Sequence, residues 1–351
     1  MPCRFTSLRT ARLAARYPIR RTYSSAPADF VRIVEVGPRD GLQNEKQSIP
    51  VATKIELVNR LAQTGLRTIE AGSFVSPKWV PQMANSSHIL EHVLASPPSS
   101  SLPITYQWLL PNIRGLDNFL TTWEEKASSE SASTAGGNSH ELSIFTAATE
   151  AFTQKNTNCS IAESLQRFEP IMSRAKEMGL KVRAYISVAL GCPYEGPNVD
   201  PHKVAELAVS LLEMGADEIS VADTTGMGTA PKTAELLKTL SAAGIEKSDI
   251  ALHFHDTYGQ ALVNTLVALE HGIRTFDSAV AGLGGCPFSP GATGNVASED
   301  LVHCFHSLGL KTGVDIEKLS EVGQWISSEI GRSNESRAGK ATMAQIGKRN
   351  A

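Results

Sequence analysis

The sequence lacks the features that mark several common protein classes. Its five cysteines include no Cys-x-x-Cys pair, so neither a zinc cluster nor a disulfide framework is expected. No segment approaches the roughly 20 consecutive apolar residues needed to span a membrane. No Gly-x-Gly-x-x-Gly turn opens a helix, and no Walker-type lysine loop occurs. Nucleotide-dependent redox chemistry and phosphoryl transfer therefore have no support in the sequence.

Acidic residues outnumber basic residues beyond the N-terminal segment. The chain has 33 basic and 36 acidic residues, and the six basic residues before position 29 are all arginines. The rest of the chain is therefore acidic overall, which argues against nucleic-acid binding. The hydrophobic share of 41% and the charged share of 20% are those of a globular protein with a sizeable core.

Residues 1–28 are rich in arginine and contain no acidic residue. Together with scattered serine, threonine and leucine, this pattern is typical of a mitochondrial transit peptide. Arg21 lies shortly before Tyr23, which places the expected cleavage near Tyr23. The alternative is a disordered basic tail. We expect the mature protein in the mitochondrial matrix.

Strand and helix signals alternate along the remaining chain. Several expected helices, such as Pro201–Met214, are followed directly by a glycine, which favours a left-handed helix end. Repeated strand–helix units with apolar strands predict a parallel sheet covered by helices, and eight such units close into a (β/α)8 TIM barrel. A doubly wound open sheet is the alternative. The expected strands are Val31–Val36, Arg67–Ala71, Ile104–Leu110, Leu142–Thr146, Val182–Val188, Glu218–Ala222, Ile250–Phe254 and Thr275–Val280.

The predicted catalytic barrel covers residues 29–312. Residues 313–351 are expected to form one extra C-terminal helix, over Asp315–Arg332, and a tail. A low-complexity insertion, residues 124–140, interrupts the barrel pattern and is too polar to form a core. Because it leads into a strand, we expect it at the N-terminal face of the barrel, away from the chemistry.

Polar residues gather where the expected strands end. His253 and His255 are two positions apart on a strand, so both side chains point to one face. Asp40 follows the first strand and could add a carboxylate, which would complete a metal site of two histidines and one carboxylate. The alternative is a purely structural histidine pair. In a TIM barrel these strand ends are the place for catalysis.

A glycine-rich loop, residues 282–295, follows the eighth strand and carries Cys286. Glycines give such a loop freedom to open and close. Composition leaves two roles open for Cys286, a proton donor on a lid or a small apolar filler. Cys192, in a Gly-Cys-Pro segment after the fifth strand, is the competing thiol.

Four segments resemble the hydroxymethylglutaryl-CoA lyase family. The similarity runs from about Val31 to Leu310. The Arg-Asp-Gly-x-Gln core of the first segment is shared with isopropylmalate and homocitrate synthases, whereas the second and fourth segments are more specific to the lyases. The segments are Val36–Glu45 (VGPRDGLQNE), Ser73–Met83 (SFVSPKWVPQM), His253–Ala261 (HFHDTYGQA) and Val280–Pro287 (VAGLGGCP).

The resemblance implies a metal-dependent lyase that cleaves 3-hydroxy-3-methylglutaryl-CoA to acetyl-CoA and acetoacetate. The partner would be an acyl-CoA thioester, with no nucleic acid and no membrane, and a homodimer is compatible with the sequence. Two alternatives stay open: a Claisen-type synthase and a non-catalytic, metal-stabilised scaffold. The resemblance implies Mg²⁺ or Mn²⁺ ligands at Asp40, His253, His255 and Asn295, and catalytic roles for Arg39, Cys286, Glu70 and Asp223.

Overall fold

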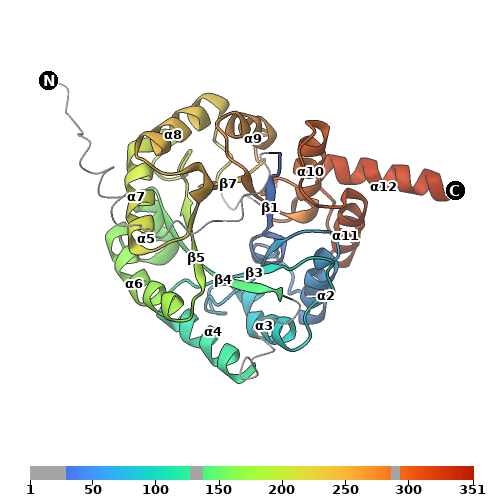
Figure 1. The fold of residues 1–351 in the computed structure, drawn as a ribbon, viewed down its shortest axis with the longest axis horizontal. Helices are drawn as coiled ribbons and strands as arrows, with labels where there is room; N and C mark the ends of the chain where they lie inside the picture. The colour runs from blue at the N-terminus through green and yellow to red at the C-terminus, as the bar shows by residue number, and fades with distance from the viewer. Residues whose placement is uncertain (1–28, 127–136, 286–292) are drawn as a thin grey trace.

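The computed structural model describes residues 29–126, 137–285 and 293–351. Its centre is a closed barrel of eight parallel strands in chain order, in which β8 also pairs with β1 (Figure 1). The (β/α)8 prediction is confirmed and an open sheet is excluded. The strands are β1 Arg32–Glu35, β2 Thr68–Ser73, β3 Thr105–Leu109, β4 Ser139–Ala147, β5 Lys181–Ser187, β6 Glu218–Asp223, β7 Ile250–Phe254 and β8 Thr275–Ser278.

Helices surround the barrel (Figure 1). Those of the described residues are α2 Val51–Ala62, α3 Ser86–Ala95, α4 Ile113–Lys126, α5 Glu150–Thr157, α6 Ile161–Glu177, α7 Pro201–Met214, α8 Ala230–Ala242, α9 Ala261–Glu270, α10 Ser298–Ser307, α11 Ile316–Glu329 and α12 Arg337–Asn350, with short helical turns η1 Gly37–Gly41, η2 Pro81–Met83, η4 Lys247–Asp249 and η5 Val280–Gly282.

Helix α7 shows how local sequence defines these elements. The Asp200 side chain accepts a hydrogen bond from the backbone N–H of His202 at 2.9 Å, and Pro201 occupies the first turn. Gly215 ends the helix with a φ of 118°, a conformation that costs glycine little. Capping signals in the sequence therefore fix both ends of the helix.

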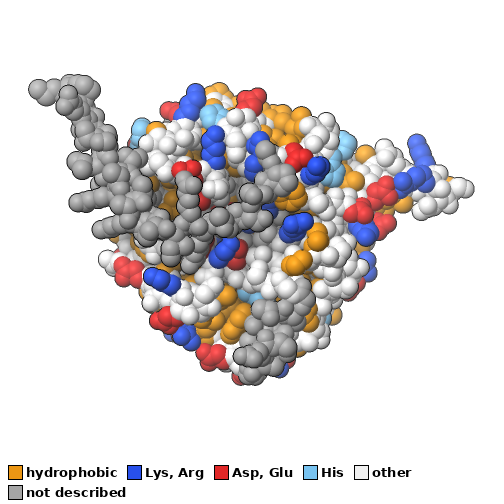
Figure 2. All heavy atoms as spheres, viewed as in Figure 1, with side chains coloured by type: hydrophobic (Ala, Val, Ile, Leu, Met, Phe, Trp, Pro, Cys, Tyr) orange, Lys and Arg blue, Asp and Glu red, His pale blue; other side chains and the backbone are white. Residues whose placement is uncertain are grey.

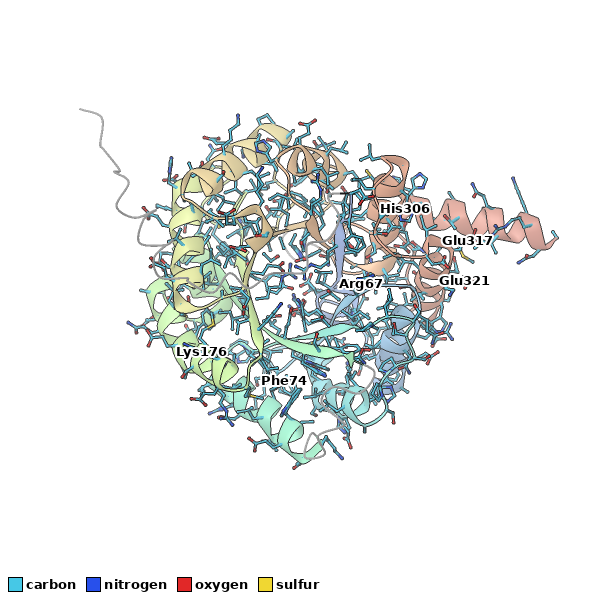
Figure 3. All side chains as sticks on the ribbon, viewed as in Figure 1. Arg67, Phe74, Lys176, His306, Glu317 and Glu321 are labelled. Atoms are coloured by element: carbon cyan, nitrogen blue, oxygen red, sulfur yellow. The ribbon has the colours of Figure 1, made fainter. Side chains whose placement is uncertain are left out.

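The outer faces of the strands pack against the helices through apolar side chains. Phe74, which follows β2 (Figure 3), meets Trp108 of β3 edge-on at a centroid distance of 6.2 Å. It also meets Phe119 of α4 edge-on at 5.5 Å. All three rings are buried, so this apolar contact fixes α4 against the sheet.

The barrel interior is polar, although a TIM barrel lumen usually contains branched aliphatic residues. Arg183 of β5 lies 2.9 Å from Glu218 of β6 and 2.6 Å from Asp277 of β8. Arg32 of β1 also pairs with Glu218. Arg183, Glu218 and Asp277 are buried, and together with the partly buried Arg32 they form a charge-balanced group inside the barrel.

Three features differ from the sequence-based expectation. Helices α3, α4 and α5 lie within the predicted strand–helix units, but no residue ranges were predicted for them. The insertion predicted over residues 124–140 begins within α4 and ends within β4, and its residues 127–136 lie outside the described part. The C-terminal region has two helices, α11 and α12, instead of one. In α12 only Gly339 is buried, so this helix lacks the apolar periodicity from which it could be predicted.

The surface of the described residues carries mixed charge. Figure 2 shows acidic and basic side chains interspersed over the drawn face. Within the described residues, none of the helices has both the length and the apolar character required to cross a bilayer.

Candidate metal centre and active site

The turn after β1 carries Arg39 and Asp40. The backbone N–H of Asp40 donates to the carbonyl of Val36 at 2.8 Å, which closes the chain into the short turn η1. At Gly37 a Cβ would lie 2.5 Å from Glu35 Oε1, so a larger residue would displace that buried carboxyl group. The glycine in this motif therefore allows the tight turn that presents Arg39 and Asp40.

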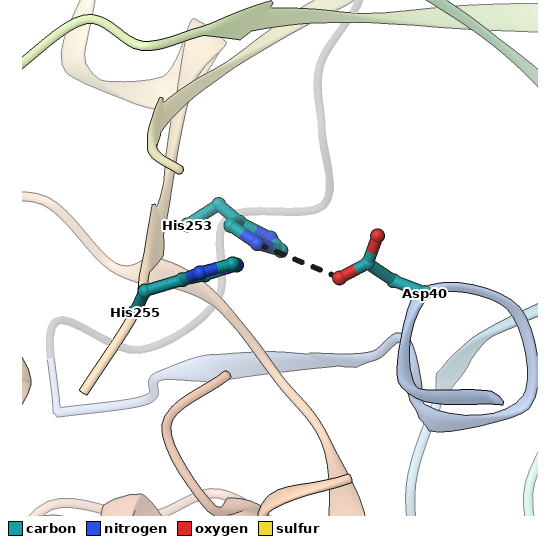
Figure 4. A group of neighbouring side chains, drawn as sticks. All are labelled: Asp40, His253 and His255. Atoms are coloured by element: carbon teal, nitrogen blue, oxygen red, sulfur yellow. Dashed lines mark ion pairs between the residues drawn. The ribbon is translucent and has the colours of Figure 1, made fainter. Parts of the chain in front are cut away.

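His253 and His255 extend from the end of β7 toward Asp40 (Figure 4). Ligand atoms of the three side chains all lie within 4.8 Å of one another. Nε2 of His253 is 3.9 Å from Oδ2 of Asp40, and the two imidazole centroids are 5.2 Å apart. The structure thus brings together His253 and His255, which the strand periodicity placed on one face, and Asp40, which was expected from the end of the first strand.

Asn295 completes one side of this cluster. Its Nδ2 donates to Asp40 Oδ2 at 2.8 Å and to the carbonyl of Leu283 at 3.1 Å. Its Oδ1 is buried and has no hydrogen-bond partner in the described residues. A buried amide oxygen without a partner is costly, and a cation would satisfy it.

The protonation states suit a cation. Burial, with a further contribution from His253, lowers the pKa of His255 to about 3, so its imidazole is neutral at pH 7. Burial alone would raise the pKa of Asp40, but the adjacent Arg39 guanidinium holds it well below its ordinary range. Neutral imidazole and ionised carboxylate are the ligand forms that divalent metals require, so these residues fit such an ion.

Arg39 is fixed by two acidic side chains. Its guanidinium donates to Glu70 Oε2 at 2.7 Å and to Asp40 Oδ1 at 2.5 Å. It also lies over the ring of Tyr185, 5.4 Å from the centroid. Because Arg39 is only 7% exposed, its charge acts in a site largely shielded from water.

Asp223 and Glu70, at the mouth of the barrel, each have one carboxylate oxygen without a hydrogen-bond partner among the described residues. Asp223 Oδ2 accepts from the backbone N–H of Gly228 at 2.9 Å, while its Oδ1 has no partner in the described residues. Burial raises the pKa of Asp223 to about 6. Burial also raises the pKa of Glu70 although Arg39 opposes it, and Glu70 Oε1 is likewise without a partner.

The two cysteines singled out in the sequence occupy different surroundings. Cys286 lies outside the described residues; the flanking Gly285 and Thr293 form a bridge, so the ends of the loop lie side by side. Cys192 is fully buried, and its sulfur lies 3.1 Å from Thr149 Oγ1. These surroundings favour a packing role for Cys192.

Tyr185, Arg183 and Asp277 were not predicted as part of this region. His253 Nδ1 lies 3.2 Å from Asp277 Oδ2, and Arg183 contacts both Asp277 and Tyr185. The strand KVRAYIS places Arg183 and Tyr185 on one face at a spacing of two. Polar residues at alternate positions of a buried strand were the available signal.

Comparisons with known proteins agree with this geometry. The sequence pattern of the HMGL-like family matches residues 30–326. The mitochondrial hydroxymethylglutaryl-CoA lyase of Rattus norvegicus is 49% identical over 312 residues, which cover 89% of each chain. A cytoplasmic 3-hydroxy-3-methylglutaryl-CoA lyase of Danio rerio is 48% identical over 313 residues, covering 89% of this chain and 87% of the relative.

Solved structures give the same result. The crystal structure of hydroxymethylglutaryl-CoA lyase from Pseudomonas aeruginosa has a TM-score of 0.81 and 48% identity, covering 90% of this chain and 98% of the other. An HMG-CoA lyase from Acinetobacter baumannii, solved with coenzyme A and 3-methylmalate, has a TM-score of 0.79 and 32% identity, covering 90% and 96%. Matched in sequence and in fold over most of its length, the chain belongs to the HMGL-like family.

Proposed function

We propose that this protein is a divalent-metal-dependent hydroxymethylglutaryl-CoA lyase that converts 3-hydroxy-3-methylglutaryl-CoA to acetyl-CoA and acetoacetate. The observation that carries the proposal is the Asp40, His253 and His255 cluster beside the buried Arg39. The family membership and the relative solved with coenzyme A support an acyl-CoA substrate.

Asp40, His253, His255 and the amide oxygen of Asn295 are the ligands we propose for Mg²⁺ or Mn²⁺. When bound, such an ion lowers the pKa of a coordinated hydroxyl group and fixes its orientation. The carboxylate and amide oxygens suit these hard cations, and the two histidine ligands are compatible with either Mg²⁺ or Mn²⁺.

The cleavage needs a base and a site for the negative charge. Asp223 removes the proton of the tertiary hydroxyl, since its free Oδ1 and its pKa of about 6 suit a base near neutral pH. The C2–C3 bond then breaks, C3 becomes the ketone of acetoacetate, and the electron pair passes to the thioester as an enolate. Arg39 stabilises that enolate oxygen, and Glu70 holds Arg39 in place.

Protonation of the enolate carbon completes acetyl-CoA. We assign this proton to Cys286, which follows the described Gly285 in the glycine-rich loop. A thiol of ordinary pKa, about 8.5, is a far better acid than a serine hydroxyl. Cys286→Ser should therefore lose most of kcat with little change in substrate affinity, whereas near-normal turnover of both Cys286→Ser and Cys286→Ala would remove Cys286 from the mechanism.

The mitochondrial matrix is the compartment we propose, on the basis of the acid-free arginine pattern of residues 1–28. Relatives named for the mitochondrion and for the cytoplasm both exist, so the proposed compartment rests on the sequence of residues 1–28. A reporter fused to residues 1–35 should enter mitochondria and be shortened; retention of the intact fusion in the cytosol would contradict it.

An assay of acetoacetate release from hydroxymethylglutaryl-CoA tests the central proposal. Activity should disappear with a chelator and return with Mg²⁺ or Mn²⁺. The synthase alternative predicts instead the condensation of acyl-CoA with a keto acid and no acetoacetate. Absence of turnover in both assays, with metal present, would leave the scaffold alternative.

A further inference from the structure

We propose that Asp277 of β8 is the positioning residue for His253, holding its imidazole with Nδ1 protonated so that Nε2 is the metal-binding atom. The inference rests on the proposed metal centre. It assigns a role to a side chain that lies inside the barrel and supplies no ligand atom to the three-residue cluster.

The two nitrogens of His253 face different partners. Nδ1 lies 3.2 Å from Asp277 Oδ2, whereas Nε2 lies 3.9 Å from Asp40 Oδ2, on the side of the proposed cation. A neutral imidazole carries one N–H, and a carboxylate can only accept. An Nδ1–H donated to Asp277 therefore leaves the Nε2 lone pair directed at the metal position.

Hydrogen bonds to both oxygens hold the Asp277 carboxylate in its orientation. Its Oδ1 accepts from Arg183 Nη2 at 2.6 Å, and its Oδ2 also accepts from Ser220 Oγ at 2.8 Å. Arg183 is held in turn by Glu218 at 2.9 Å. With donors on both oxygens, the carboxylate is locked in the orientation that receives Nδ1–H.

His255 provides an internal contrast. Its Nδ1 is buried and has no hydrogen-bond partner in the described residues. Among the residues that the structure describes, a carboxylate therefore lies behind His253 but not behind His255. The loss of such a supporting carboxylate behind a histidine ligand typically weakens metal binding by about 10–100-fold.

The test compares two substitutions that each neutralise one acidic partner of Arg183. Asp277→Asn replaces the carboxylate that faces His253 with a neutral amide, which presents its NH₂ group to His253 when its oxygen keeps the contact with Arg183. Glu218→Gln leaves the His253 contact intact. We expect Asp277→Asn to raise the Kd for Mn²⁺, measured on the metal-free protein by electron paramagnetic resonance, about 10–100-fold. Glu218→Gln should change it by less than about threefold. Equal shifts in the two variants would overturn the assignment, because the loss of a charge inside the barrel would then be enough to explain the weaker binding. An unchanged Kd in Asp277→Asn would overturn it as well.

The tautomer itself gives a second readout that needs no folded variant of Asp277. Long-range ¹H–¹⁵N spectra of the wild-type protein labelled at histidine, with His253→Asn used for assignment, should show His253 protonated at Nδ1. Protonation at Nε2 would overturn the proposal. If the wild-type protein binds no Mn²⁺, the proposed metal centre is contradicted. If it binds Mn²⁺ but lacks lyase activity, the proposed function is contradicted while the role of Asp277 stands.

Discussion

Buried acidic side chains occur in two regions of this molecule and differ in what their oxygens contact. At the barrel mouth, Glu70 and Asp223 each have one oxygen without a hydrogen-bond partner in the described residues. Outside the barrel, where β1 and β8 meet the C-terminal helices, Glu35 and Glu299 use both oxygens. All four carboxyl groups are buried, so burial alone does not separate a catalytic acid from a structural one.

The second region uses carboxyl groups to satisfy backbone N–H groups. Glu35 Oε1 accepts from the N–H of Gly37 at 2.8 Å and of Val280 at 2.9 Å. Both oxygens of Glu299 accept from the N–H of Ala281, at 3.1 and 2.9 Å. Ala281 has a φ of 57°, so Glu299 stabilises a left-handed backbone that alanine rarely adopts.

Raised pKa values do not mark the site either. Burial raises the pKa of Glu35 to about 7 and that of Glu299 to about 8, further than the value of about 6 for Asp223. What distinguishes Asp223 is a carboxylate oxygen that has no hydrogen-bond partner in the described residues and lies near the proposed metal ligands. An oxygen without a hydrogen-bond partner indicates a place for a ligand only together with its position beside the proposed metal ligands, because Ser327 and Asn334, near the C-terminal helices, also have a buried polar atom without a partner in the described residues.

Arg39→Lys should produce the largest effect and tests the barrel mouth directly. Lysine keeps the charge but loses the planar fork that contacts Glu70 and Asp40 together. Loss of one oxyanion donor costs about 10²–10³-fold in kcat in comparable enzymes. We expect a fall of that size in steady-state kcat with the Mn²⁺ affinity nearly constant. A defect cured by added metal would show that Arg39 helps to assemble the metal site and does not act in catalysis.

His253→Ala should weaken the metal centre by about 10–100-fold or more, since it removes a ligand and not merely its support. The Mn²⁺ concentration that gives half-maximal activity should rise accordingly, while the thermal unfolding of the metal-free protein changes little because the barrel has its own core. His271→Ala, at the end of α9, is the matched control. An unchanged metal requirement would contradict a ligand role for His253.

Glu299→Gln tests the structural region through pH. The folded chain keeps the Glu299 proton up to about pH 8, whereas an ordinary glutamate loses it near 4.5. Between these values the folded state holds the extra proton, so the free energy of unfolding should fall as pH rises, by up to about 1.4 kcal/mol per pH unit. Urea unfolding between pH 6.5 and 8 should show a shallower slope for Glu299→Gln, with lyase activity retained. An identical slope would contradict the raised pKa.

Local signals in the sequence predicted the barrel and the shared face of His253 and His255, whereas the roles of Arg39, Glu70, Asp223 and Asn295 were implied by the family resemblance. Apolar strand segments and glycines at helix ends are signals carried within a few residues, as Gly215 shows at the end of α7. The facing of His253 and His255 follows from the strand period of two. These features needed no knowledge of which strands become neighbours.

The features that escaped prediction depend on closure of the barrel or on docking of distant segments. Asp277 meets His253 because β7 and β8 pair with these two residues in register. Helix α12 is held at its start by Asp300 of α10, which accepts from Ser336 Oγ and from the N–H of Ala338, both at 2.7 Å. Neither contact has a signature in the local sequence.

The smallest effect, a loss of unfolding free energy, should come from replacing two serines that cap helices in different surroundings. Ser160 starts α6 at the surface, and its Oγ accepts from the N–H of Glu163 at 3.1 Å. Ser336 starts α12 fully buried; its Oγ accepts from the N–H of Gly339 at 2.8 Å and donates to Asp300.

Each cap replaced by alanine should cost about 0.5–2 kcal/mol in the free energy of unfolding. We expect Ser160→Ala near the lower end, because water can replace the lost contact. Ser336→Ala should lie near the upper end, because it also leaves the Asp300 carboxylate without one buried donor. Urea titrations of both variants measure the difference, with lyase kcat expected to stay at the wild-type value. Equal losses would mean that the buried acidic region stabilises its helix no more than a surface cap does.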